Sequence, residues 1–151
     1  MDHDHTHFMQ MALEQAAKAG RQQEVPVGAI LVDDTGKILA ATHNQVETLG
    51  DPTAHAEILA LREGARKVMN YRLLRTRLYV TVEPCVMCMG AIIHARVAQV
   101  VFGTQDPKWG AAGSLYNFAQ NARLNHHPEI IAGVCADDCR EMLQDFFRQR
   151  R

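Results

Sequence analysis

Two short stretches of the sequence hold side chains whose types and spacing could bind a metal ion and activate water. DPTAHAEILAL contains His55 and Glu57, and VEPCVMCMG contains Cys85 and Cys88. Zinc accepts neutral imidazole and thiolate ligands, and three protein ligands leave the fourth tetrahedral position for water. His55, Cys85 and Cys88 are therefore predicted to form a catalytic zinc site rather than a closed structural one.

The spacing of these residues indicates where on their helices they lie. Residues two apart on a helix point about 200° away from each other, so His55 and Glu57 could serve one site only at a helix's first turn. Cys85 and Cys88 are three apart and share a helical face, where the positive end of the helix dipole favours thiolates. We therefore expect two helix N-termini to converge on one metal ion.

Glu57 is the side chain that this ligand set leaves free. Two thiolates formally cancel the charge of zinc and weaken it as a Lewis acid, so activation of water requires a base beside the metal. A carboxyl group between that water and a substrate can act first as base and then as acid, which suits replacement of an amino group by oxygen. Glu57 is the predicted catalytic residue.

Alternating helices and strands are expected to position these side chains. Strands after an initial hairpin, with helices between them, imply a five-stranded mixed sheet covered by helices on both faces, a three-layer α/β/α sandwich. Sites in such sheets form beyond the carboxyl ends of strands. The pattern predicts helices over residues 7–22, 51–67 (with Asp51 as the cap), 85–96 and 137–150, and strands in VPVGAILVDD, KILAATHN, RLYVTVE, QVVFG and EIIAGV.

Length, composition and charge narrow the class of protein. A chain of 151 residues is expected to form a single domain that buries roughly 70% of its unfolded surface, with residues 1–6 as a mobile tail. The formal net charge of −1 excludes a globally basic nucleic-acid binder but permits a local basic patch. The N-terminus lacks an apolar signal region and no apolar run approaches the roughly 20 residues of a membrane span, so a cytoplasmic location with reduced cysteines is expected.

The motifs AHAEILAL, EPCVMCMGAIIHARV and FGTQDPKWGAAGSL resemble those of the bacterial tRNA-specific adenosine deaminases, members of the cytidine/deoxycytidylate deaminase family. The first two motifs are shared with nucleoside and nucleobase deaminases, and the third is more discriminating. The resemblance implies a cytidine-deaminase-like fold, a homodimer with one Zn²⁺ per subunit, and conversion of adenosine to inosine at the wobble position of a tRNA anticodon stem-loop, chiefly that of an arginine tRNA. By motif match, Asn44 contacts the flipped nucleoside, and Asp106 and Lys108 border the anticodon groove.

Other candidate residues have structural readings that compete with functional ones. Cys135 and Cys139 could complete a four-cysteine site, but their spacing favours small buried residues. The alternating histidines of the N-terminal tail could bind adventitious metal, whereas mobility is the better reading. The C-terminal arginines with Lys108 could form a modest RNA patch or a solvated helix end. The histidines are His3, His5 and His7, and the C-terminal arginines are Arg148, Arg150 and Arg151.

Three functions remain open from the sequence. The first is the RNA-editing deaminase, whose unpaired anticodon loop makes extrusion of the adenine from its stack inexpensive. The second is a deaminase of free nucleobases or nucleosides such as guanine or cytosine, which the same catalytic residues would support. The third is a zinc-stabilised binding domain without chemistry, which the free Glu57 argues against.

Overall fold

Five strands form one mixed sheet in the order β2-β1-β3-β4-β5. The computed structural model describes the backbone of residues 2–150 and the side chains of residues 5–150. Strand β1 is antiparallel to β2 and β3, while β3, β4 and β5 are parallel. The strands are β1 (Gly28–Val32), β2 (Ile38–His43), β3 (Arg77–Val82), β4 (Gln99–Thr104) and β5 (Glu129–Ile131). The helices are α1 (Asp2–Arg21), α2 (Val46–Leu49), α3 (Ala56–Val68), α4 (Val86–Ala95), a 3₁₀ turn (Phe118–Gln120) and α5 (Ala136–Gln149).

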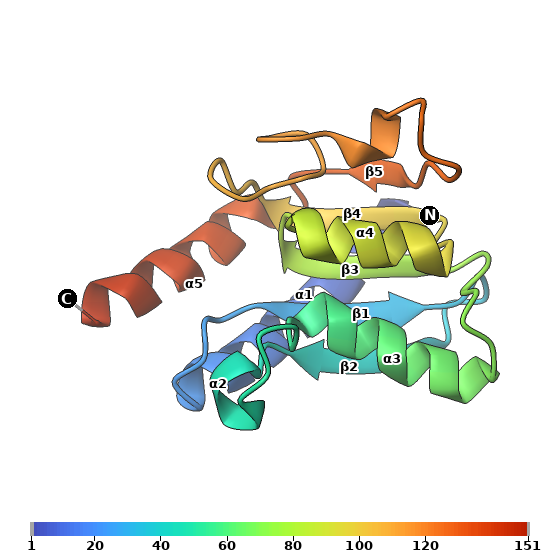
Figure 1. Cartoon of the computed structure of the whole chain (residues 1–151). Coiled ribbons are helices and arrows are strands. Elements are labelled where there is room, and N and C mark those ends of the chain that lie inside the picture. Colours follow the sequence, from blue (N-terminus) through green and yellow to red (C-terminus); the bar gives the residue numbers. More distant parts are fainter. Residues whose placement is uncertain (1, 151) are drawn as a thin grey trace.

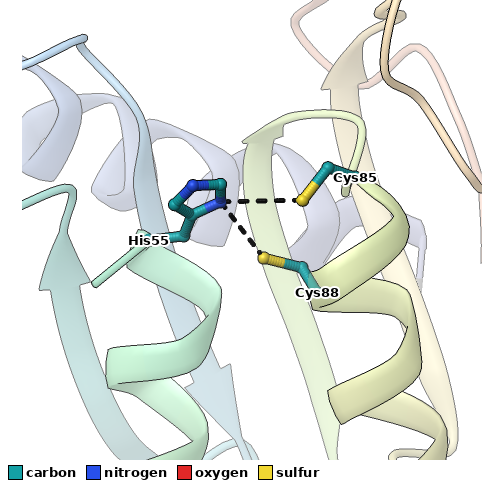
Figure 2. A group of neighbouring side chains, drawn as sticks. All are labelled: His55, Cys85 and Cys88. Carbon is teal, nitrogen blue, oxygen red and sulfur yellow. Dashed lines mark hydrogen bonds between the residues drawn. The ribbon is translucent and has the colours of Figure 1, made fainter. Parts of the chain in front are cut away.

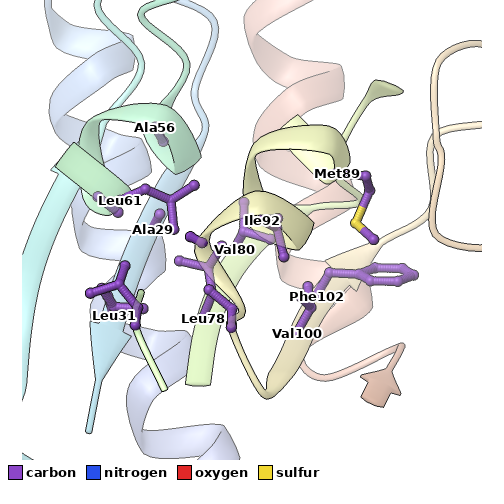
Figure 3. Close-up of a cluster of buried hydrophobic side chains, with 14 of the residues drawn as sticks. Ala29, Leu31, Ala56, Leu61, Leu78, Val80, Met89, Ile92, Val100 and Phe102 are labelled. Carbon is purple, nitrogen blue, oxygen red and sulfur yellow. The ribbon is translucent and has the colours of Figure 1, made fainter. Parts of the chain in front are cut away.

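Helices cover both faces of the sheet, which confirms the expected three-layer arrangement. Helices α3 and α4 lie side by side on one face, and α1 lies behind the sheet (Figure 1). Successive strand residues point to opposite faces. Ala29 and Leu31 accordingly join the core beneath α3 and α4 (Figure 3), while Ile30 and Val32 pack with α1 and α5. The sheet therefore separates two hydrophobic cores.

Helix α1 presses directly on β1 at Gly28. A Cβ atom at Gly28 would lie 2.0 Å from the backbone oxygen of Ala12, so no larger residue fits there. One face of this helix is buried against the sheet, with Met9 fully buried and Met11 only partly buried. The buried members of that face are Phe8, Met9, Ala12, Ala16 and Ala19.

The sequence predicts that residues 1–6 form a mobile tail, but in the structure part of this segment belongs to helix α1. Helix α1 begins at Asp2 rather than near His7, and His5 is 7% exposed with its Nδ1 atom 2.8 Å from the hydroxyl of Tyr79. A buried histidine with a hydrogen-bonding partner is held in the fold and is a poor trap for adventitious metal. Met1 and the side chain of His3 lie outside the described residues.

Residues 45–55 contain the main error in the expected elements. The sequence predicts a loop and then a helix capped by Asp51, but a short helix α2 comes first and α3 begins only at Ala56. The carboxylate of Asp51 instead accepts hydrogen bonds from the backbone amide and hydroxyl of Thr53, at 2.8 and 2.7 Å. Asp51 therefore closes a turn, and the helix starts four residues later than its cap-like sequence suggests.

No helix in the described part of the chain combines the length and apolar character that crossing a bilayer requires.

Candidate active site

His55 is the residue immediately before helix α3. Its backbone is extended, with φ −70° and ψ 153°, and its side chain makes no capping hydrogen bond to the helix. The imidazole is therefore free to point away from the helix axis, and Glu57 lies in the first turn behind it. This is the placement that allows residues two apart to face one site.

Cys85 occupies the same position at the start of α4. Its backbone is also extended, its side chain makes no capping bond, and Cys88 follows in the first turn of the helix. The two helices begin next to each other, so the partial positive charges of both N-termini favour anionic sulfur at this point. The expected convergence of two helix N-termini is confirmed (Figure 2).

The three candidate ligand atoms fit a tetrahedral zinc ion. The Nδ1 atom of His55 lies 3.7 Å from the Sγ of Cys85 and 3.4 Å from the Sγ of Cys88. Zinc bonds of normal length at tetrahedral angles separate such donor atoms by roughly 3.5–3.8 Å. Within residues 5–150, these are the residues grouped closely enough to hold a metal ion. The donor set is thus two sulfurs and one nitrogen, as predicted.

Hydrogen bonding already distributes the charge among these ligands. The bond with Cys88 lowers the pKa of the Cys85 thiol to about 4, and the bond with His55 adds to this effect. The pKa of Cys88 is raised, chiefly because Cys85 shares its proton. The hydrogen bond with Cys85 likewise raises the pKa of His55. One thiolate is therefore favoured before any metal binds, and a metal ion would displace the shared proton.

Glu57 is a buried carboxyl group beside the ligands. Its side chain is 4% exposed, and burial raises its pKa to about 7. A carboxyl group with a pKa near neutrality can be either protonated or ionised under ordinary conditions. That property is what a residue needs to accept a proton in one step and return it in the next.

A cavity of about 610 Å³ opens over His55, Glu57 and Cys85. Its volume falls within the roughly 300–1,000 Å³ typical of small-molecule sites. Beyond His55, Glu57 and Cys85, the wall is contributed by segments that are distant in the sequence. These wall residues include Gln23, Glu24, Val25, Val27, Asn44, Val46, Glu47, Glu83, Asp106, Trp109, Phe146, Phe147 and Arg150.

Asn44 and Asp106, two of the residues expected from the family resemblance, line this cavity, and Lys108 does not. Asn44 is 8% exposed and lies just after β2, where its backbone amide donates to the carbonyl of Val27 at 3.0 Å. Asp106 follows β4, and its carboxylate accepts hydrogen bonds from the backbone amides of Lys108 and Trp109. Lys108 is exposed on the outside of that turn.

Glu83 and the loop after β4 are joined by a set of hydrogen bonds that the sequence analysis missed. The Glu83 carboxylate is 3% exposed and accepts bonds from the backbone amides of Asp106, Ala112 and Ser114 at 3.1, 3.0 and 3.0 Å, and from the Ser114 hydroxyl. Because Glu83 precedes Cys85 by two residues, it connects the cavity loop to the segment that carries this candidate metal ligand. The signal in the sequence that could have identified Glu83 is an acidic residue placed directly after a buried apolar strand.

Glu24 plays a similar role elsewhere on the cavity wall. It is 2% exposed, and its carboxylate accepts hydrogen bonds from the backbone amides of Glu47 and Thr48 at 3.2 and 2.6 Å and from the Thr48 hydroxyl at 2.6 Å. Helix α2 has no cap from its own adjacent residue. Glu24 therefore supplies the acceptor that this short helix requires at its N-terminus.

The end of α5 forms the aromatic edge of the cavity. Phe146 and Phe147 line the cavity, Phe147 is 48% exposed, and the helix extends beyond the sheet (Figure 1). Arg150 lies over the Phe146 ring, 4.4 Å from its centroid, and donates to the backbone oxygen of Gln23 at 2.6 Å. Arg148 is paired with Asp145 at 2.7 Å. The expected basic patch is thus partly engaged within the chain, and Arg151 lies outside the described residues.

The remaining cysteines, Cys135 and Cys139, lie at the N-terminal end of α5. Cys139 is 1% exposed and belongs to the core between the sheet and α1, as expected, while Cys135 is half-buried at the start of α5. A Cβ atom at Gly103 would lie 2.3 Å from the Cys139 sulfur, which shows how closely this thiol packs. Neither cysteine belongs to the His55 group.

Comparison with known sequences assigns the family. Residues 2–104 match the family model described as the cytidine and deoxycytidylate deaminase zinc-binding region. A tRNA-specific adenosine deaminase of Haemophilus influenzae is 50% identical over 144 residues, covering 95% of this chain and 83% of that protein. The corresponding protein of Bacillus subtilis is 45% identical, covering 95% of this chain and 89% of its own length.

Solved structures agree with the sequence relatives. A structure from studies of tRNA:A34 deaminases superposes with a TM-score of 0.88 at 42% identity, covering 91% of this chain and 99% of that one. A guanine deaminase of Bacillus subtilis superposes with a TM-score of 0.64 at 30% identity, covering 95% and 91%. With three candidate zinc ligands on two adjacent helix N-termini and these relatives over nearly its whole length, the chain belongs to the cytidine and deoxycytidylate deaminase family, among the tRNA-specific adenosine deaminases.

Proposed function

We propose that this protein is a zinc-dependent deaminase that hydrolyses adenosine to inosine at the wobble position of a tRNA anticodon, chiefly that of an arginine tRNA. The observation that carries the proposal is the buried Glu57, which lies beside the His55 group in a cavity large enough for a nucleoside. The relatives named for tRNA-specific adenosine deamination extend over most of the chain and most of their own length.

His55, Cys85 and Cys88 would hold the zinc ion, which when bound supplies a water of lowered pKa as the nucleophile. Glu57 would accept a proton from the attacking water while its oxygen adds to C6 of adenine. Glu57 would then donate this proton to the ring nitrogen N1. It would next carry the second proton, from the added hydroxyl group, to the amino group, which leaves as ammonia. The net reaction consumes one water and gives inosine and ammonia.

The chain positions the substrate through residues on the cavity wall. The side-chain amide of Asn44 has both donor and acceptor groups and lies in the same cavity as Glu57, which suits hydrogen bonding to a nucleoside. Glu57 lies too deep for a base that stays stacked, so the adenosine must leave its stack to react. An unpaired anticodon loop allows this at low cost, and recognition of a loop relies on pockets and stacking more than on a broad cationic face.

One assay tests the proposed function. The zinc-loaded protein is incubated separately with an arginine anticodon stem-loop, free adenosine, free cytidine and free guanine, and the products are identified by mass spectrometry. Inosine formed from the stem-loop, with little product from the free compounds, is the expected result. Turnover of only the free compounds would contradict the tRNA substrate.

Deamination of a free base is the second candidate function. The structural likeness to guanine deaminases favours it, because those proteins share the fold over most of both chains. The guanine arm of the same assay decides between the two candidates, since activity on guanine alone would establish the second.

We further propose a cytoplasmic homodimer. Helices α3 and α4 leave between them a shallow apolar groove of about 390 Å³, a surface that a second copy could cover. Light scattering should give twice the mass of one chain, and Ala91→Asp, which places a charge in the groove, should shift the protein toward monomer. The groove residues are Ile58, Leu61, Arg62, Ala65, Tyr71, Ala91, His94 and Ala95.

A further inference from the structure

Trp109 is a large aromatic side chain left exposed at the edge of the active-site cavity. It is 66% exposed, it lines the cavity, and it is the single tryptophan of the chain. An indole ring offers a broad apolar face that would gain from being covered. Because Trp109 forms part of the cavity wall, a ligand that enters the cavity comes within reach of this face.

The backbone of Trp109 is held in place before any ligand arrives. Its amide and that of Lys108 donate to the carboxylate of Asp106 at 3.3 and 3.1 Å. The next residue, Gly110, donates to the backbone oxygen of Asp106 at 2.8 Å and pairs with Cys85 in an isolated β-bridge. A platform that is already ordered loses little conformational freedom when it binds a ligand.

Exposure increases from the catalytic residues to the edge of the cavity. Glu57 and Asn44 are 4% and 8% exposed, whereas Trp109 is 66% exposed. A reacting adenine must reach the level of Glu57, and the phosphodiester chain on either side must leave the cavity. The base next to the adenosine therefore emerges at the level where Trp109 lies.

We infer that Trp109 stacks on the base of a nucleotide adjacent to the deaminated adenosine. This inference rests on the proposed function, since a free nucleobase has no neighbouring nucleotide. Aromatic side chains commonly bind unpaired RNA bases by stacking, and such contacts tolerate different bases because each has a π face. The role is in substrate binding and leaves the proton transfers of Glu57 unchanged.

Kinetics of Trp109 variants on the stem-loop test the inference. Trp109→Ala should raise KM about 5- to 100-fold with a much smaller change in kcat, because the lost contact is made equally before and during the reaction. Trp109→Phe keeps an aromatic face and should recover most of the affinity. Tyr116→Ala is the matched control, because Tyr116 is a 52% exposed aromatic residue of the same loop that does not line the cavity.

Fluorescence supplies a readout that a purely structural role would not change. All tryptophan emission comes from Trp109, so titration of the stem-loop into the zinc-loaded Glu57→Gln protein should quench it with saturation. Each of the two nucleotides that flank the adenosine is then replaced in turn by an abasic unit. The replacement that abolishes the quenching identifies the base that stacks on Trp109.

The outcomes separate this inference from the proposed function. Inosine formation by the wild type together with unchanged fluorescence and an unchanged KM for Trp109→Ala overturns the stacking role alone. Loss of the dimer in Trp109→Ala without a change in KM also overturns it, since the ring would then serve subunit contact. Absence of inosine from the wild type with the stem-loop overturns both proposals.

Discussion

The carboxylate of Glu83 lies directly against Gly110, so closely that a Cβ atom at Gly110 would come within 2.4 Å of the carboxylate carbon. Glu83 thereby reaches three backbone amides of the loop that carries Asp106 and Trp109. The absence of a side chain at Gly110 is what permits this approach. The buried Glu83 carboxylate therefore fixes the position of this loop relative to Cys85, the candidate metal ligand two residues further along the chain.

Gly110→Ala should disturb this arrangement. The new methyl group must displace the Glu83 carboxylate or the loop, at a cost of about 1–3 kcal/mol, which corresponds to a fall in Tm of roughly 3–10 °C. KM for the stem-loop should rise because the loop lines the cavity. Gly90→Ala is the control: apart from the adjacent residues and the backbone of its own helix, nothing lies within 4 Å of its added Cβ, and alanine in the interior of α4 should stabilise by about 0.5–1 kcal/mol. Equal Tm values for the two variants would contradict the role of Glu83.

Glu57→Gln should retain zinc and lose almost all turnover. The amide preserves the shape of the side chain but cannot carry a proton, so kcat should fall by about 10²–10⁴-fold or more. Metal content by mass spectrometry and inosine yield are measured on the same preparation, with Glu14→Gln as an exposed control of the same chemistry. Substantial activity with the metal in place would remove Glu57 from its assigned role.

The candidate metal ligands could be predicted from the sequence because their signal is local. His55 and Glu57 are two residues apart and Cys85 and Cys88 three, and each pair lies at the start of one helix. Such a pattern can be recognised without knowledge of the fold. The alternation of helices and strands likewise predicted the sheet and its covering layers.

The supports of the cavity were missed because they join distant residues. Glu24 bonds to residues 47 and 48, and Glu83 to Ala112 and Ser114, which are 23 to 31 positions away. A buried acid in a sequence indicates that some partner exists, but not which. Helix α2 illustrates the consequence, since its N-terminal acceptor comes from Glu24 rather than from its own residues, and a search for local caps misses it.

Glu24→Gln should destabilise the protein in a pH-dependent manner. Burial raises the pKa of Glu24, but hydrogen bonds from Thr48 and the backbone outweigh this effect and lower the pKa below its usual value. A depressed folded pKa means that the stabilisation is fully present above the unfolded pKa of about 4.3 and is lost as pH falls through the folded value. At pH 7 the variant should lose about 1–3 kcal/mol of unfolding free energy.

The control for Glu24 is again Glu14→Gln, which removes the same charge from an exposed site. Urea unfolding at pH 7 and at pH 3 gives the difference between wild type and variant at each pH. This difference should shrink at pH 3 for Glu24→Gln and stay near zero for Glu14→Gln. A difference that is independent of pH would show that the carboxylate's charge is not what holds α2.

Chelation of zinc should make one cysteine far more reactive than the other three. The bond with Cys88 lowers the pKa of half-buried Cys85 to about 4, whereas burial raises the pKa of Cys139 to about 12 and that of Cys135 above its usual value. At pH 6 Cys85 is then a thiolate while the other thiols stay protonated. Iodoacetamide should label Cys85 at least about tenfold faster than Cys135, even though a thiolate of low pKa is intrinsically less nucleophilic.

Peptide mass spectrometry locates the label, circular dichroism verifies that the chelated protein stays folded, and restoring zinc should protect Cys85. Labelling of Cys85 at the same rate with and without zinc would show that its sulfur is not a ligand.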